Sequence, residues 1–319
     1  MSRAAPSGPA VPVTHAHTAG PMAAAVLRDK APLAVTAVFE KSFYCRDDRD
    51  RWLCFLRDDL ESGPLHVLCA NWPADLNRRI LEGQTLAPDG DGVMAAPALA
   101  IDCTMFREWR PPVFPPPNPS ALRRALPRLR DAMRMAAPKD TVADLALNGR
   151  PPDDGWRRAA AEKAIQALDT LSRWLASAQE PLLRDAVRAL VGLGPGLTPT
   201  GDDILAGTLL TLHALGRKTE AGKMAVALKP HASEGTNPIS LAHLRTAASG
   251  LGAAPFHDML NELLLGGESL DQCLRRIDAI GHSSGWDILT GILTTMECHA
   301  SQRGNSAHGA ENDQTAPLM

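Results

Sequence analysis

The spacing of apolar positions along the chain changes near residue 113. Before it, short runs rich in β-branched, aromatic and other apolar residues are separated by turn residues, such as those at 47–48 and 62–64. Runs of this kind predict strands, and they lie at residues 33–45, 52–56, 65–70 and 99–103. We therefore expect residues 27–113 to form a small β-rich domain.

After residue 113, apolar residues recur at helical spacing. Leu122, Leu126, Leu129 and Met133 share one helix face, and similar faces follow at 164–175 and 183–191. Further helices are predicted at residues 203–216, 219–229, 238–249, 256–265, 269–280 and 286–301. Residues 114–302 are thus expected to form an all-α domain, which makes the fold class α+β.

The ends of the chain and the joint between the domains have their own composition. Residues 1–26 and 303–319 are rich in small and polar residues, which predicts disordered tails. A cluster of prolines at 111–119 predicts a stiff, extended connector.

Composition excludes several classes of function. The chain is 45% apolar and 22% charged, as in ordinary globular proteins, and its net charge of −3 with no basic tract argues against a nucleic-acid partner. No apolar run is long enough to span a bilayer, so no membrane role is expected. The six cysteines form no Cys-x-x-Cys pair, which argues against structural zinc and predicts buried thiols in a cytoplasmic protein.

One eight-residue pattern occurs twice. Residues 200–207 read TGDDILAG and residues 284–291 read SGWDILTG. In both copies a Ser or Thr precedes an Asp by three positions and an apolar run follows, which predicts a helix start with Thr200 or Ser284 as the cap. Gly207 and Gly291 hold equivalent places inside the two helices and indicate a close approach between them. A helix N-terminus is a favourable place for a small anion.

The loop before the first copy, residues 192–199, is rich in glycine and proline. Gly194 and Gly196 permit positive φ and a close approach to a ligand. No Lys is present for a phosphate loop of the Walker type, and the helical spacing upstream excludes a dinucleotide-binding turn. The structural alternative is a rigid corner between two helices.

Acidic and basic groups accompany these loops. Asp202 and Asp203 could simply stabilise a helix start, or Asp202 could face a ligand that carries both a carboxylate and an amide N–H. Carboxylates would also suit Mg²⁺, although no cofactor is required. His282, beside Ser283, is a candidate proton carrier or a locally packed side chain. A third helix start, at residues 236–240, could join the same pocket.

These considerations define a set of candidate residues. The candidate catalytic residues are Asp202, Asp203 and His282, and no metal ligands are assigned. The candidate ligand-binding residues are Gly194, Gly196, Thr198, Thr200, Gly201, Thr236, Asn237, Ser240, Ser283, Ser284 and Asp287.

The motifs at 192–203, 236–240 and 281–287 resemble those of a bacterial family of unknown function that includes a subunit of oxamate carbamoyltransferase, an enzyme of anaerobic allantoin breakdown. The resemblance implies a transferase subunit in purine catabolism that converts oxalurate and phosphate into oxamate and carbamoyl phosphate. It implies small anionic substrates, and either partner subunits in a hetero-oligomer or a homodimer. Two alternatives stay open: a non-catalytic metabolite-binding or scaffolding subunit, and a metal-dependent hydrolase that uses the aspartates.

Overall fold

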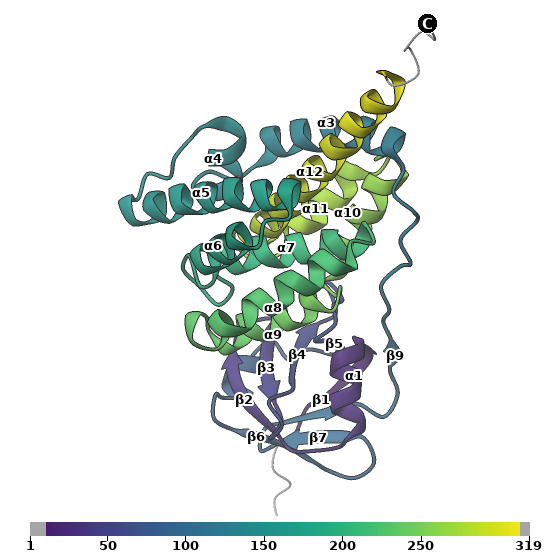
Figure 1. Ribbon diagram of the computed structural model, residues 1–319. Helices are drawn as coiled ribbons and strands as arrows, with labels where there is room; N and C mark the ends of the chain where they lie inside the picture. Colours follow the sequence, from purple (N-terminus) through teal and green to yellow (C-terminus); the bar gives the residue numbers. More distant parts are fainter. Residues whose placement is uncertain (1–10, 313–319) are drawn as a thin grey trace, which may run out of the picture. The chain divides into compact units, whose positions relative to one another are not determined.

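The computed structural model describes residues 11–312, and the side chains of this range except those of residues 232, 233 and 303–312. The chain divides into two units, with the boundary between Arg110 and Pro111, close to the expected boundary after residue 113. A β-rich first unit and a helical second unit confirm the α+β fold class (Figure 1).

The first unit is a closed β-barrel. Its strands follow the order β5-β4-β3-β2-β6-β7-β8-β1, and β1 pairs again with β5, so that no edge of the eight-stranded sheet is left open. The short strand β9 adds to β1 in parallel. The strands are β1 (Val13–Ala19), β2 (Leu33–Val38), β3 (Ser42–Arg46), β4 (Trp52–Arg57), β5 (His66–Ala70), β6 (Thr85–Pro88), β7 (Val93–Ala96), β8 (Leu99–Asp102) and β9 (Arg107–Glu108).

The barrel core explains which strands the sequence predicted. Phe43, Leu53, Phe55 and Val67 are buried, and they lie in the aromatic and β-branched runs that predicted strands. The predicted run 33–45 is the hairpin of β2 and β3. Two short helices, α1 (Pro21–Arg28) and α2 (Leu76–Arg79), belong to the same unit, and α1 buries small residues such as Ala23 and Ala24 in this core.

The expected N-terminal tail is wrong over its described part. Within residues 11–26, predicted to be disordered, the chain forms β1 and most of α1. In β1 the inward positions are held by Thr14, Ala16 and Thr18, so the alternation is real but its buried members are small or polar. Residues 1–10 of this predicted tail lie outside the described residues.

The second unit consists of helices. They are α3 (Pro119–Ala136), α4 (Val142–Asn148), α5 (Gly155–Ser177), α6 (Glu180–Leu190), α7 (Thr200–Ala214), α8 (Lys218–Gly235), α9 (Pro238–Ala248), α10 (Ala254–Leu265), α11 (Leu270–Asp278) and α12 (Ser284–Asn312). The expected helices are present, and α4 is additional. Helix α12 continues beyond residue 302, where a tail was expected, and residues 313–319 lie outside the described residues.

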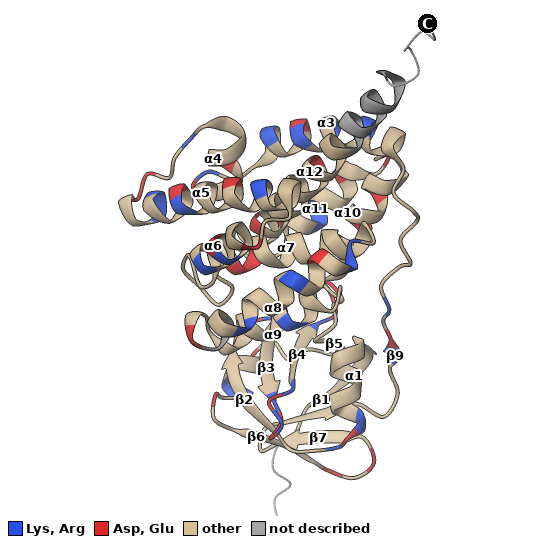
Figure 2. Ribbon diagram, viewed as in Figure 1, with Lys and Arg blue, Asp and Glu red and all other residues tan. Residues whose placement is uncertain are grey.

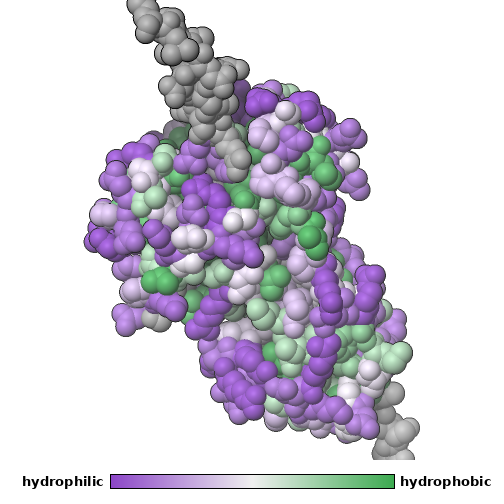
Figure 3. Space-filling model, turned by 45° about the vertical axis from the view of Figure 1, so that its right-hand side comes forward, coloured by the Kyte–Doolittle hydropathy of each residue, from purple (hydrophilic) through white to green (hydrophobic). Residues whose placement is uncertain are grey.

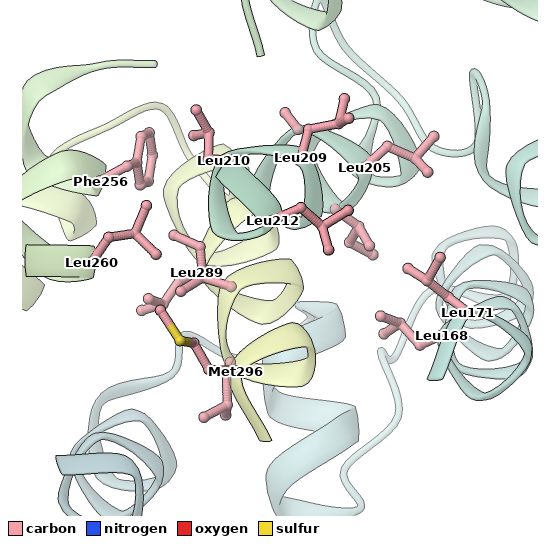
Figure 4. Packing of buried hydrophobic residues seen from close by; sticks show 14 of the residues in the cluster. Leu168, Leu171, Leu205, Leu209, Leu210, Leu212, Phe256, Leu260, Leu289 and Met296 are labelled. Atoms are coloured by element: carbon pink, nitrogen blue, oxygen red, sulfur yellow. The ribbon is translucent and has the colours of Figure 1, made fainter. Parts of the chain in front are cut away.

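Helix α7 lies at the centre of this unit. Every residue from Gly201 to Leu212 is buried, and the helix packs along α12. Figure 4 shows Leu205 and Leu212 of α7 directed toward leucines of α5, while Leu210 faces Phe256 of α10. Charged residues lie on more peripheral helices such as α3 and α5 (Figure 2). The burial explains why α7 is apolar on all sides after its first turn.

The surface carries apolar residues mainly as scattered single side chains. On the face drawn in Figure 3 they are interspersed with hydrophilic residues, and scattered apolar exposure of this kind is normal. In the part of the chain that the structure describes, no helix combines the length and hydrophobicity needed to cross a bilayer.

Candidate functional site

The two copies of the repeated motif pack against each other through their glycines. A Cβ atom on Gly207 would lie 2.0 Å from the carbonyl oxygen of Ile288, and one on Gly291 would lie 2.2 Å from that of Ile204. Gly207 and Gly291 are equivalent positions of the repeat, as are Ile204 and Ile288, so the contact is reciprocal. This confirms that the starts of α7 and α12 approach each other closely.

A second pair of glycines fixes the corner before each helix. A Cβ atom on Gly201 would lie 1.9 Å from the carbonyl oxygen of Leu190 in α6, and one on Gly285 would lie 2.1 Å from that of Ile277 in α11. Each copy of the motif therefore turns tightly out of the helix before it. The pairs α6–α7 and α11–α12 are two versions of one helical corner that face each other.

The hydroxyl groups of the motif reach across to the other helix. Thr200 donates to Asp287 at 3.0 Å, and the Ser284 hydroxyl hydrogen-bonds to Asp203. The expectation that Thr200 caps its own helix with Asp203 as its partner is wrong. Pro199 is the N-cap of α7, no side chain caps it, and both hydroxyl residues lie inside the first helical turn.

Further hydroxyls surround these crossed pairs. Thr198 and Ser284 lie 2.7 Å apart, oxygen to oxygen, and Thr198 also hydrogen-bonds to Asp203. The hydroxyl of Ser283 hydrogen-bonds to Asp287. These hydroxyl residues are partly exposed, whereas the carboxyl groups they contact are buried. The hydroxyl residues are thus the more exposed members of this cluster.

The two carboxyl groups are incompletely paired. Asp203 is 5% exposed and Asp287 is 1% exposed, and one oxygen of each has no hydrogen-bond partner among the described residues. Burial, and then the neighbouring charge of Asp287, raise the pKa of Asp203 well above its ordinary value. Burial raises the pKa of Asp287 to about 6. Buried carboxyl groups with an incomplete set of donors favour the protonated form.

Asp202 has the opposite environment. Its carboxylate accepts hydrogen bonds from the backbone N–H of Gly192 at 2.9 Å, from the hydroxyl of Ser240 at 2.6 Å, and from the hydroxyl of Thr236. The residue is 1% exposed. Asp202 was expected to face a ligand, but these donors of the protein occupy its carboxylate. It ties the loop at 192 to the start of α9.

The start of α9 is hydrogen-bonded to the glycine-rich loop and to Asp202. Asn237 caps α9 through the backbone N–H of Ser240 and donates to the carbonyl oxygen of Leu197 at 2.8 Å. Gly192 has φ of 69°, and a Cβ there would lie 1.8 Å from the carbonyl oxygen of Gly235. Thr236, Asn237 and Ser240 therefore hold the glycine-rich loop in place.

Backbone amides of the two helix starts are largely occupied. The N–H of Gly201 donates to Leu193, and that of Gly285 donates to Ile280. The N–H groups of Asp203 and Asp287 bond to the carbonyl groups of Pro199 and Ser283. The expectation that such amides point into a shared cavity is thus not met at these positions, because the tight corners supply their acceptors. The side-chain hydroxyls are further donors at the two helix starts.

The other predicted residues lie at the rim. Gly194 has φ of 110°, and a Cβ there would lie 2.9 Å from the backbone nitrogen of Thr200, so this loop folds onto the start of α7. Gly196 has φ of 98° and is exposed. His282 is exposed at the turn before α12. Among the residues whose side chains the structure describes, no group of three or more His, Cys, Asp or Glu could hold a metal ion.

The repeated motif, the glycine-rich loop and the start of α9 all fall within one matched segment. Residues 190–296, about a third of the chain, match the model of a family described as oxamate carbamoyltransferase subunit AllH. No solved structure matches the chain. Residues 190–296, which hold the whole candidate site, are therefore similar to the family of the oxamate carbamoyltransferase subunit AllH.

Proposed function

We propose that this chain is a subunit of an oxamate carbamoyltransferase and binds a small anion at the crossed hydroxyls between α7 and α12. The observation that carries the proposal is the reciprocal arrangement of Thr200 with Asp287 and of Ser284 with Asp203. It lies inside the segment that matches the family. Two helix N-termini contribute a favourable electrostatic field for an anion at this place.

The proposed reaction requires donors and a proton carrier. An oxygen of phosphate attacks the carbamoyl carbon of oxalurate, the carbon–nitrogen bond breaks, and the proton that hydrogen phosphate loses passes to the leaving nitrogen, which gives oxamate and carbamoyl phosphate. Thr198, Thr200, Ser283 and Ser284 offer hydroxyl donors to the phosphate or to the oxalyl carboxylate. His282, exposed beside Ser283, is our candidate to carry the proton.

The glycines and Asp202 have a supporting role in this proposal. Gly194 and Gly196 shape the loop that carries Thr198, and Gly201 brings α7 against α6. Asp202 fixes the same loop to Thr236 and Ser240. We propose Asp202 as a positioning residue, because its carboxylate accepts hydrogen bonds from three donors of the protein.

Other subunits belong to the proposal, since the family is described as a subunit. We expect the chain to purify with partners and to support turnover only in that complex. A second candidate is favoured by the burial of Asp203 and Asp287: a non-catalytic subunit in which the crossed pairs only hold the helical corners together.

An assay of the natural complex separates the two candidates. The complex, purified through this chain from its own host, is assayed for carbamoyl phosphate formed from oxalurate and phosphate. Ser284→Ala and Thr198→Val should each lower kcat/KM about 10²-fold or more if the hydroxyls stabilise charge in the transition state. Thr170→Val, which removes a hydroxyl on α5 that bonds to Gln166, is the matched control and should leave turnover unchanged.

Turnover by the variants and by the wild-type complex decides between the two candidate functions. Intact complexes of both variants with normal turnover would support the non-catalytic subunit. A wild-type complex that forms no carbamoyl phosphate would reject the proposed reaction.

A further inference from the structure

The buried carboxyl groups of Asp203 and Asp287 have no direct role in the proposed reaction, although both are incompletely paired. Oδ2 of Asp203 and Oδ1 of Asp287 have no hydrogen-bond partner among the described residues, and the exposed fractions of the two residues are 5% and 1%. They occupy equivalent positions of the repeat, each in the first turn of its helix. Two buried carboxylates with unpaired oxygens are unfavourable unless hydrogen-bond donors stabilise their charge or protons neutralise it.

In the described part of the chain, no Lys, Arg or His stands among the main influences on the pKa of Asp203 or of Asp287. The loop at 191–199 and the start of α9 at 236–240 contain no Lys or Arg. Asp202 lies on α7 and His282 in the exposed turn, and the packed helices α6, α9 and α11 carry further charged or titratable residues, among them Arg184, Asp185, Arg188, His243, Arg245, Asp271, Arg275, Arg276 and Asp278. Arg188 pairs with Asp185, and Arg276 pairs with Asp258. Asp202 adds further negative charge near Asp203, and Asp278 accepts a hydrogen bond from Trp286. Protons are therefore the available means of lowering the charge of the pair.

The crossed hydroxyls couple this charge to an incoming ligand. A hydroxyl has one donor hydrogen, and Thr200 directs its hydrogen to the carboxylate of Asp287. When the carboxyl carries a proton, the carboxyl can donate and the hydroxyl can accept. The hydroxyl hydrogen is then released toward solvent, where an anion can accept it. The same reversal applies to Ser284 and Asp203.

We propose that Asp203 and Asp287 share one proton in the free protein and take up a second when a small anion binds at the hydroxyls of Thr198, Thr200, Ser283 and Ser284. The two residues are positioning residues that act through these hydroxyls. This inference rests on the anion site of the proposed function and adds its protonation state. It also explains how two carboxyl groups can lie beside an anion site, since the second proton leaves both of them neutral.

The raised pKa values agree with this assignment. Coupled carboxyl groups release their protons in two steps that belong to the pair. Burial raises the pKa of Asp287 to about 6, and burial together with the charge of Asp287 raises the pKa of Asp203 well above its ordinary value, which agrees with a pair that retains a proton in the free protein. A bound anion makes the second proton harder to remove. Above about pH 6, one proton is therefore taken up for each anion bound, and affinity falls about tenfold for each pH unit.

Calorimetry on the full-length protein tests the proposal. Oxamate is the probe, because it does not titrate near neutral pH as phosphate does. Titrations at pH 7 in two buffers of different ionisation enthalpy should show uptake of about one proton per oxamate, and affinities should fall about tenfold per unit above about pH 6. The double variant D203N/D287N should lose both effects, whereas Asp185→Asn, a control on the exposed face of α6, should keep them.

Two results would overturn the inference: oxamate binding by the wild type without proton uptake, or unchanged uptake in the double variant. If the double variant does not fold, infrared spectra of the wild type replace it. A protonated-carboxyl band that does not grow on adding oxamate at pH 7 would then overturn the inference.

The same measurements separate failure of this inference from failure of the proposed function. Oxamate binding without proton uptake, with carbamoyl transfer intact, removes this inference alone. Proton-linked binding without transfer removes only the proposed reaction, and absence of oxamate binding removes the anion site and the inference together.

Discussion

At the scale of single residues, Asp202 and Asp203 show how neighbours in one helical turn acquire opposite chemistry. Asp202 accepts hydrogen bonds from Gly192, Thr236 and Ser240. Asp203 faces Asp287 and keeps one oxygen without a partner. Both residues are buried, so their exposure does not distinguish them. They differ in the hydrogen-bond donors that surround each carboxyl group.

The raised pKa of Asp287 predicts a measurable dependence of stability on pH. Its pKa rises from 3.8 when unfolded to about 6 when folded, because burial disfavours the charged form. The stability that it contributes is fully present below about pH 4 and is lost as the pH rises through about 6, a change of about 3 kcal/mol. Urea unfolding of the wild type and of Asp287→Asn at several pH values should show their difference in stability changing by that amount.

The direction of this change is part of the prediction. The wild type should lose stability relative to Asp287→Asn as the pH rises from about 4 to about 7. The difference between the wild type and the exposed-residue control Asp185→Asn should vary much less. A constant difference between the wild type and Asp287→Asn across this range would show that Asp287 is ionised in the folded protein throughout.

At the scale of elements, α7 and α12 are joined by backbone-to-backbone contact. Gly207 and Gly291 let each helix reach the carbonyl groups of the other, at a position where any side chain would collide. Glycine inside a helix costs about 1 kcal/mol relative to alanine. Because of these two glycines, the starts of α7 and α12 lie close together. The hydroxyl group of each helix start can therefore bond to a carboxyl group of the other helix.

Alanine substitutions test this contact with an internal control. Gly207→Ala and Gly291→Ala should each destabilise the protein by about 1–3 kcal/mol, because the added Cβ overpacks the helix crossing. Gly222→Ala, in α8, has nothing within 4 Å of the added atom and should stabilise by up to about 1 kcal/mol. Urea unfolding measures all three, and a stabilised Gly207→Ala would contradict the described packing.

At the scale of the whole molecule, the two units have separate hydrophobic cores. One core is built from the strands and α1, and the other from α3 to α12. Each unit contains buried cysteines, among them Cys54 of β4, which packs in a small separate cluster with Leu56 and Leu68, and Cys273 of α11. Burial raises the pKa of both thiols, to about 11 for Cys273. Both should therefore react with alkylating reagents only after their own unit unfolds.

Cysteine labelling should resolve the two units during unfolding. In a urea series analysed by mass spectrometry, Gly207→Ala should lower the midpoint for labelling of Cys273 and leave that of Cys54 unchanged, because the substitution affects only the α unit. Cys298, which is partly exposed, should react first in the native protein. Equal shifts of both midpoints would show that the two units unfold as one.

The sequence predicted much of the fold, and the failures have definite causes. Strands with aromatic and aliphatic inward residues, such as β4, were found, as were the long amphipathic helices. β1 was missed because its inward positions are Thr and Ala, and α4 because it is only seven residues long. Both depend on tertiary contacts rather than on a strong local pattern.

The candidate site was predicted in its location but not in its connections. The repeated motif supplied the candidate site residues, whose function stays a prediction, and its glycines correctly predicted the close approach of α7 and α12. The pattern of Ser or Thr followed by Asp also fits a cap within one helix, so the sequence could not show that the hydroxyls bond to the opposite helix. Nor could it show that the tight turns before α7 and α12 supply carbonyl acceptors for several backbone N–H groups in the first turns of these helices.

The sequence by itself determined the division into a β-rich and a helical unit, because hydrophobic periodicity is a local property of each element. It also determined which eight residues are repeated and that their glycines lie at a helix contact. Only the tertiary structure decided that Thr200 pairs with Asp287, that Asp202 accepts three hydrogen bonds, and that Asp203 and Asp287 are buried with unpaired oxygens. These properties arise between segments far apart in the chain, where burial and neighbouring charge set the chemistry of a carboxyl group.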